Sequence, residues 1–467
     1  SAGSAPLEEL AESFSRRDEA ATSIQRALDQ QTPWSTQGGM KRSLRSGNLV
    51  RSRRGGVRRR RWLDGVDTVL WGIPLGITAI AGILIASTQR QVHYTDWTDH
   101  WLTAAVGFGL ALLLKLLPLD RLKPLLWPLY GATVASLIAV RVVGVSALGA
   151  QRWINIAGFH VQPSEFAKLA AILLLAGVLS KYPVERPVDL LRPSGMIAVP
   201  WLLVFIQPDL GTSLVFGAIL ITMLYWSGMT SSWVILLLSP LVTAILASAA
   251  PWLLLIWIPL MGWLAWSQLP WKQLGSGIVV GIEALFAAVS PYLWMHGLKD
   301  YQRERLVLFL NPSQDPLGGG YHLIQSRIGI GSGELWGTGL LHGHLTKLRF
   351  IPEQHTDFIF SAMGEETGFL GSVLLIGAYV LLIRRLLEIA KLARSDFESL
   401  IVIGIAGMLM FQVVINISMT IGLGPVTGIP LPWMSYGRSA MLVNFIALGL
   451  CSSVATRGKK AKQTTMA

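Results

Sequence analysis

Apolar runs of about twenty residues recur along this chain, and they restrict its possible folds more than any other feature. About twenty helical residues span the hydrocarbon core of a bilayer, where every backbone polar group must be hydrogen-bonded within its own helix. The sequence therefore predicts an all-α polytopic membrane protein with about 10–12 transmembrane helices. The expected spans lie near 66–88, 101–118, 124–144, 164–182, 194–207, 211–227, 231–249, 251–268, 275–297, 367–386, 399–421 and 438–455.

Basic residues gather at both ends of the chain, beside the outermost apolar runs. The formal net charge is +12, and the two clusters lie at 41–61 and 457–462. Such clusters are typical of a cytoplasmic topology signal that also contacts anionic membrane lipid, so no nucleic-acid partner is expected. The single cysteine excludes an intrachain disulfide. We predict a basic, mostly disordered cytoplasmic extension (1–62), a transmembrane domain (63–456) and a basic cytoplasmic tail (457–467).

The remaining Lys and Arg residues predict the orientation of the spans. With a cytoplasmic N-terminus, basic residues fall in loops expected inside, such as 181–192 and 384–394, whereas the expected outside loops nearly lack them. A chain in lipid places polar residues where water or a ligand meets it, so we expect one composite site on the outer face. Four polar stretches share that face: 151–168, 207–212, 300–366 and 422–438.

The stretch from 298 to 366 is expected to form a large extracytoplasmic loop. Its runs at 301–310 and 323–330 resemble short interfacial helices that lie on or dip into the bilayer. Asp315 is flanked by Pro and Gly, which predicts a carboxylate on an exposed turn. That carboxylate could act as a base or could only hydrogen-bond its own backbone.

Several ionisable residues near span starts are candidates for binding or for structure. Glu165 and Lys168 lie three residues apart on one helical face, so they could pair with each other or line a substrate cavity. Arg152 could bind substrate or anchor the chain at the membrane boundary. Asp209 precedes a span, which favours a helix cap over a catalytic role.

The acidic and His-rich end of the outer loop does not have the spacing of a zinc site. His355, Asp357 and the pair Glu365–Glu366 match no compact ligand motif. Asp357 and Glu366 are instead expected to organise the return of the loop into the membrane. The metal content is unknown, although Mg²⁺ or Mn²⁺ held between carboxylates and a phosphate remains compatible with the sequence.

Long motifs in this chain resemble the SEDS family (shape, elongation, division and sporulation), which includes RodA and FtsW. The matching stretches read GAQRWINIAGFHVQPSEFAKLA (149–170), QPDLGTSLV (207–215) and GPVTGIPLPWMSYG (424–437), together with the whole outer loop. The loop is more similar to the RodA-like elongation type than to the division type. The chain departs from the family in an extra apolar hairpin within 231–276 and in Arg438, which follows SYG where a small residue is usual.

The resemblance implies a peptidoglycan glycosyltransferase that polymerises lipid II on the outer face of the bacterial cytoplasmic membrane. It implies that Asp315 is the base, and it makes cations of the loop candidates for gripping the pyrophosphate. A class B penicillin-binding protein and other elongation proteins are the implied partners. A lipid II flippase and a non-catalytic scaffold are the alternatives. The candidate substrate-binding residues are Arg152, Glu165, Lys168, Arg303, Lys347 and Arg349.

Small residues on two predicted spans offer a weaker indication of a partner helix. They lie at 104–111 and 404–407, and small side chains let helices approach closely in a membrane.

Overall fold

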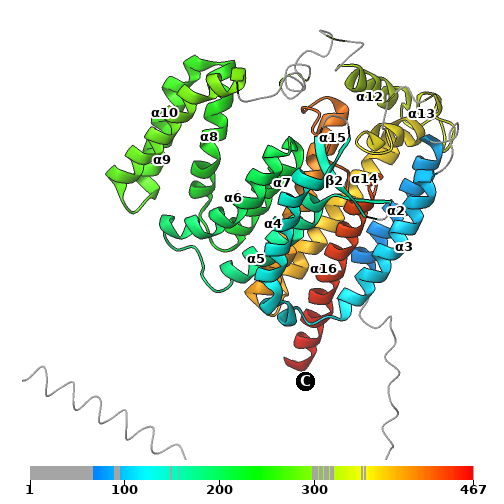
Figure 1. Ribbon diagram of the computed structural model, residues 1–467, viewed down its shortest axis with the longest axis horizontal. Helices are drawn as coiled ribbons and strands as arrows, with labels where there is room; N and C mark the ends of the chain where they lie inside the picture. Colours follow the sequence, from blue (N-terminus) through cyan, green and yellow to red (C-terminus); the bar gives the residue numbers. More distant parts are fainter. Residues whose placement is uncertain are drawn as a thin grey trace, which may run out of the picture. The chain divides into compact units, whose positions relative to one another are not determined.

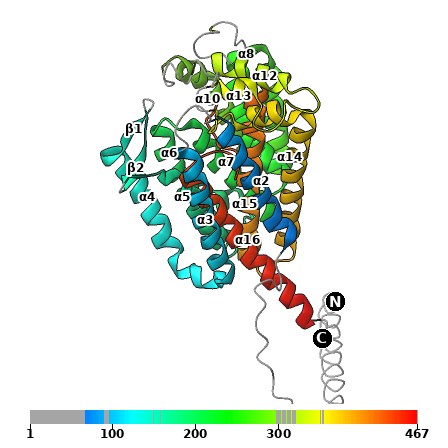
Figure 2. The same ribbon diagram turned by 90° about the vertical axis from the view of Figure 1, so that its right-hand side faces the viewer.

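The computed structural model describes residues 67–88, 95–147, 150–156, 158–296, 303, 309, 315, 320–348, 351 and 354–465. In these residues the chain is predominantly helical (Figures 1 and 2). The predicted N-terminal extension 1–62 and most of the run 301–310 lie outside the described residues.

A helix is found at each predicted membrane span. Their bounds are α2 (Thr68–Thr88), α3 (Thr95–Leu116), α4 (Leu126–Val143), α5 (Pro163–Leu179), α6 (Leu191–Ile206), α7 (Leu210–Trp226), α8 (Ser231–Ala249), α9 (Leu254–Gln268), α10 (Lys272–His296), α14 (Ile359–Lys391), α15 (Asp396–Ile421) and α16 (Arg438–Thr465). Short 3-10 turns precede α4, α6 and α9: η1 (Leu119–Leu125), η2 (Pro187–Leu190) and η3 (Pro251–Leu253).

Length and composition support the membrane-spanning prediction for most of these helices. Within the described residues, eight helical segments are long and apolar enough to cross a bilayer. Helices α5 and α7 have 17 residues each, about 25 Å at 1.5 Å per residue, at the lower limit of a span. The prediction of a helical multi-pass membrane protein is confirmed.

Helices α15 and α16 form the centre of the structure. Their apolar windows are 72% and 83% buried inside the protein, against 6% for α10. A Cβ at Gly404 of α15 would come within 2.7 Å of Ile172 on α5 and 2.8 Å of Met223 on α7. The small residues at 404–407 therefore serve packing within this chain. Within 104–111, Ala111 lies against Gly449 of α16, whereas Ala105 and Gly109 are exposed. The contact of this run with a partner helix stays a prediction.

Helices α8, α9 and α10 pack mainly on one another (Figure 1). Their shared interface contains Glu283 of α10, which is fully buried and accepts hydrogen bonds from Ser239 and Thr243 of α8. The predicted extra hairpin lies in this group, where α8 and α9 coincide with its two spans. Its status as an insertion stays a prediction.

A small antiparallel sheet between α4 and α5 was not predicted from the sequence. Its strands are β1 (Val145–Ala147), β2 (Ala150–Ile156) and β3 (Phe159–Val161), in the order β1-β2-β3. Ile154 lies opposite Val161 and Ile156 opposite Phe159. The sheet occupies the first half of the first polar stretch, as a hairpin that leads directly into α5.

The described part of the outer loop holds α12 (Tyr321–Ser332) and α13 (His344–Lys347). Helix α12 includes the run 323–330, which was predicted to be a short helix. The predicted contact of this helix with a bilayer stays a prediction. At the end of the chain, α16 continues to Thr465, about ten residues beyond the predicted span. The predicted basic tail is therefore largely a helical extension of the last span.

Candidate functional site

The four polar stretches of the sequence meet at one end of the helices, which we name the loop end because α12 and α13 lie there (Figure 2). The Gln162 backbone N–H donates to Ser439 Oγ at 2.9 Å, and Gln162 Nε2 donates to Asp209 Oδ2 at 3.3 Å. The Tyr436 backbone N–H donates to the His355 carbonyl at 2.8 Å. These contacts join segments that are distant in the sequence.

Asp209 caps α7, as predicted. Its carboxylate accepts from the Thr212 backbone N–H at 3.1 Å, which satisfies one of the free donors at the helix start. Arg152 lies 3.9 Å from the same carboxylate and donates to the carbonyls of Gln207 and Pro208. The Arg152 guanidinium thus holds the β2 strand against the start of α7. Its role toward substrate stays a prediction.

Glu165 and Lys168 form a buried ion pair one turn inside α5. The Lys168 Nζ donates to Glu165 Oε1 at 2.7 Å, and the two side chains are only 1% and 3% exposed, respectively. Pairing of the two residues is confirmed. The cost of burying each charge is offset by the other, so the pair can persist at this depth in a membrane protein. Whether it also touches substrate stays a prediction.

The carboxylates of Glu365 and Glu366 bind the backbone around α13. Glu365 accepts from the backbone N–H groups of Leu345 and Thr346, at 2.7 Å and 2.9 Å, and from the Thr346 hydroxyl at 2.7 Å. Glu366 accepts from the Leu341 N–H at 2.9 Å and from Ser87 Oγ on α2. These contacts support the loop-organising role predicted for Glu366. Glu365 has an equal share, which the sequence reasoning did not assign.

A close backbone crossing ties the loop to the start of α14. The N–H groups of Thr338 and Gly339 donate to the carbonyls of Glu365 and Glu366, at 2.9 Å and 3.1 Å. The crossing requires glycine, because a Cβ at Gly337 would lie 2.2 Å from the Glu366 carbonyl oxygen and its φ is +82°. The segment that carries Lys347 is therefore fixed to α14.

The predicted loop-organising residue Asp357 lies beside the fourth polar stretch. Asn416 of α15 donates from Nδ2 to the carbonyls of Asp357 and Ile429, at 3.0 Å and 2.7 Å. A Cβ at Gly428 would lie 3.4 Å from Asp357 Oδ2. Asn416 is fully buried and was not a candidate from the sequence. The available signal was an amide side chain, shared only with Gln412, inside a long apolar span.

Two aspartates at the start of α3 were also missed. Asp96 lies 3.3 Å from His355 Nε2, and Asp99 pairs with Arg438. The Arg438 guanidinium also lies 5.3 Å from the ring centre of Phe159. Burial, followed by the charge of Asp96, raises the pKa of Tyr436 to about 12, so its hydroxyl stays protonated. Arg438 thus connects α3, β3 and α16.

The predicted base, Asp315, is exposed, and its carbonyl accepts from the Gly320 N–H at 3.0 Å, directly before α12. Arg303 is half-buried, and Arg349 lies outside the described residues. Lys347 is half-buried on α13, near Glu366; burial raises the pKa of Glu366, and the charge of Lys347 only partly opposes that rise. The roles of these four residues stay predictions.

The described part of the acidic end of the loop contains no ready cluster of metal ligands. Within the described residues, no group of three or more His, Cys, Asp and Glu side chains could hold a metal ion. Each carboxylate oxygen of Glu365 and Glu366 already accepts a hydrogen bond. The Mg²⁺ or Mn²⁺ considered from the sequence stays an untested prediction.

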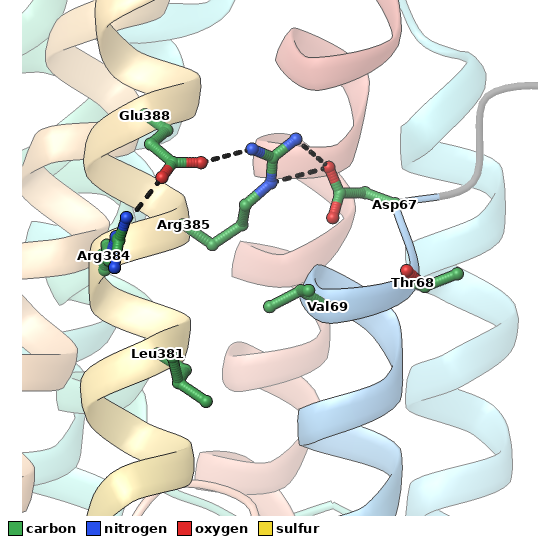
Figure 3. Close-up of a pocket in the computed structure, with 7 residues that line it drawn as sticks. All are labelled: Asp67, Thr68, Val69, Leu381, Arg384, Arg385 and Glu388. Atoms are coloured by element: carbon green, nitrogen blue, oxygen red, sulfur yellow. Dashed lines mark hydrogen bonds and ion pairs between the residues drawn. The ribbon is translucent and has the colours of Figure 1, made fainter.

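A second polar cluster lies at the opposite end of the helices (Figure 3). The Arg385 guanidinium on α14 binds Asp67 Oδ2 at 2.6 Å and 2.9 Å and also pairs with Glu388, whose other oxygen lies 3.5 Å from Arg384. Asp67 in turn accepts from the Leu70 N–H at 3.2 Å, which caps α2. The cluster joins α2 to α14 beside a cavity of about 380 Å³.

Comparison with known proteins decides the family. A model of the cell cycle proteins FtsW, RodA and SpoVE matches residues 66–257 and 250–460. The chain belongs to the FtsW/RodA/SpoVE family. The peptidoglycan glycosyltransferase MrdB of Escherichia coli K12, a curated relative, is 36% identical over 339 residues, which cover 71% of this chain and 78% of MrdB.

Two solved structures have the FtsW/RodA/SpoVE fold seen here. A chain of a peptidoglycan synthase complex, solved for the coordination of polymerization and crosslinking, aligns with a TM-score of 0.64 and 30% identity over 84% of this chain and 98% of its own length. The rod shape determining protein RodA of Thermus thermophilus aligns with a TM-score of 0.55 and 27% identity over 83% and 96%. The two matched ranges overlap at 250–257, which covers η3 and the first turn of α9, inside the predicted extra hairpin.

Proposed function

We propose that this chain is a peptidoglycan glycosyltransferase that polymerises lipid II into glycan strands during cell elongation. Membership of the FtsW/RodA/SpoVE family carries the proposal, since relatives across most of the chain have this activity in their names. The convergence of four polar stretches at the loop end supports it, because a lipid-linked sugar needs a polar site at the membrane boundary.

Asp315 is the proposed base of this reaction. Its carboxylate would take the proton of the acceptor sugar hydroxyl while that oxygen attacks the anomeric carbon of the donor. The bond from this carbon to the pyrophosphate breaks, and its electron pair leaves with undecaprenyl pyrophosphate. Attack from the face opposite the leaving group inverts the anomeric carbon. Pyrophosphate leaves without a strong general acid, so one carboxylate and nearby cations suffice.

The cations proposed to receive the pyrophosphate are those that the fold leaves near the loop. Lys347 lies on α13, whose backbone N–H groups at Leu345 and Thr346 donate to Glu365, so this cation belongs to a rigid segment. Arg303 and Arg349 belong to the same outer loop. Arg152 is engaged with the start of α7, so its contribution would be to hold β2 in place.

The proposed location is the bacterial cytoplasmic membrane, with both termini in the cytoplasm and the loop end outside. The basic residues support this orientation, because the helix ends and loops opposite to the loop end hold Lys181, Arg192, Arg384 and Arg394. The proposed partner is a class B penicillin-binding protein. The solved synthase complex that aligns with this chain combines polymerization with crosslinking, which supports such a pairing.

The test uses the full chain, purified with and without a class B penicillin-binding protein, and fluorescent lipid II. Glycan products are separated on a gel. We expect polymer from the wild type and a loss of about 10²–10⁴-fold in rate for Asp315→Asn, because a positioned base contributes that much. The matched control is Asp120→Asn, an exposed aspartate that pairs with Lys123 between α3 and α4 at the opposite end.

Four results would contradict the proposal. Undiminished polymer from Asp315→Asn would remove the base assignment, and an equal loss from Asp120→Asn would make the effect unspecific. Movement of lipid II across vesicles without any polymer would favour the flippase alternative. The absence of both activities, with the partner present, would favour a scaffold.

A further inference from the structure

A cluster of two cations and one tyrosine lies where α5 ends and α6 begins, opposite to the loop end. Lys181 Nζ is 5.4 Å from the ring centre of Tyr182, and the Arg192 guanidinium carbon is 5.1 Å from the same centre. In the described part of the chain, neither cation forms an ion pair with a carboxylate. The aromatic ring therefore holds together two positive charges that remain available to an anion.

This cluster borders a cavity of about 220 Å³. A water molecule occupies about 30 Å³ in the liquid, so the cavity has room for a phosphodiester group. Two acidic residues also line it, and they differ in availability. Asp189 Oδ2 accepts from the Arg186 backbone N–H at 2.9 Å, as part of the cap of η2. Glu185 is exposed on the rim, where it can accept a hydrogen bond from a headgroup amine or hydroxyl.

Exposed apolar side chains flank the two cations. Val188 and Leu191 are 51% and 71% exposed, and they lie four residues and one residue before Arg192. Helices α5 and α6 are membrane spans, so their junction lies at the membrane boundary. A cation pair beside exposed apolar side chains matches a phospholipid, whose phosphate is followed directly by acyl chains.

We propose that Lys181, Arg192 and Tyr182 form a binding site for the phosphate of a membrane phospholipid, with the acyl chains on Val188 and Leu191. Under the proposed orientation the lipid belongs to the cytoplasmic leaflet. The site lies away from the loop end and goes beyond the proposed polymerase function, so it holds whether or not the chain polymerises lipid II. A bound lipid would fix the α5–α6 junction at the end of the helix that carries Glu165 and Lys168.

The test is native mass spectrometry of the full chain, released from detergent micelles and titrated with phosphatidylglycerol. We expect Lys181→Gln with Arg192→Gln to weaken binding by roughly 30-fold, about fivefold for each cation lost at a membrane surface. Tyr182→Phe should bind like the wild type, because it keeps the ring, and Tyr182→Leu should bind more weakly. The control Lys391→Gln removes an exposed cation at the end of α14 and should leave binding unchanged.

Further measurements distinguish a phospholipid from a free anion as the ligand, and a loss of binding from a folding defect. Inorganic phosphate at millimolar concentration should not displace the lipid, and Leu191→Gln should weaken the lipid alone. Displacement by phosphate would show a free-anion site and overturn the lipid assignment. An equal loss in Lys391→Gln would overturn the site itself, as would equal binding by Tyr182→Leu and Tyr182→Phe. The melting temperature of each variant is measured, and binding is compared only among variants that melt within a few degrees of the wild type.

Discussion

The buried pair Glu165–Lys168 permits a sharp prediction, because removal of one partner leaves the other charge inside the protein. Lys168→Met keeps the length of the side chain but deprives the buried carboxylate of Glu165 of its donor at 2.7 Å. Loss of one member of a buried ion pair costs about 3–5 kcal/mol. The double variant Glu165→Gln with Lys168→Met removes both charges and should recover most of this loss. The free energy of unfolding in mixed micelles, measured by denaturant titration, checks both values.

The double-mutant cycle also separates structure from substrate binding. If Lys168→Met and Glu165→Gln have additive effects on stability, the two side chains do not depend on each other and the reasoning fails. If the double variant recovers its stability and also polymerises lipid II normally, the pair is structural. Recovered stability with lost activity would instead place the pair against the substrate, the alternative that the sequence left open.

Three other predictions concern single positions. Asp209→Ala should lower the unfolding free energy by about 1 kcal/mol through the lost cap of α7, and Asp209→Asn should largely retain it; denaturant titration checks this. Gly404→Ala should cost about 1–3 kcal/mol, because its Cβ meets Ile172 and Met223, whereas Gly76→Ala, with nothing within 4 Å, should be tolerated. Burial raises the pKa of Glu366 above its ordinary value of 4.5. The folded state therefore binds this proton more tightly than the unfolded state, and protonation of Glu366 at low pH stabilises the fold. Melting temperature should therefore fall as the pH rises above this ordinary value, and Glu366→Gln should reduce the slope; a steeper slope in the variant would refute this.

The spans could be predicted because one physical requirement determines them. A helix in lipid must be apolar over about twenty residues, and this pattern stands out in the sequence. The sheet β1-β2-β3 was missed because hydropathy does not report it. The available signal was local: Ala157-Gly158 separates two short runs of β-branched and aromatic residues, which is typical of a two-residue hairpin.

The candidate site was predictable where its partners are close in the sequence. Glu165 with Lys168 and Asp209 with Thr212 are each three residues apart, so helix geometry alone brings them together. Asp99 and Arg438 are 339 residues apart, and only the packing of α3 on α16 joins them. Arg438 is an unusual residue after SYG, and in the structure it compensates the charge of Asp99 and covers Phe159.

Helix α14 holds the outer loop in a fixed position relative to the membrane helices. Near one end, Arg385 ties it to Asp67 at the start of α2. At the other end, Glu366 binds Ser87 near the end of the same helix. Helices α2 and α14 are thus joined at both ends, and the hydrogen bonds that Glu365 and Glu366 accept from the backbone of the α13 segment fix that segment to this pair. The segment that carries Lys347 is therefore held rigidly against α14, so we expect any rearrangement of the loop that admits a lipid-linked sugar to occur in segments other than α13.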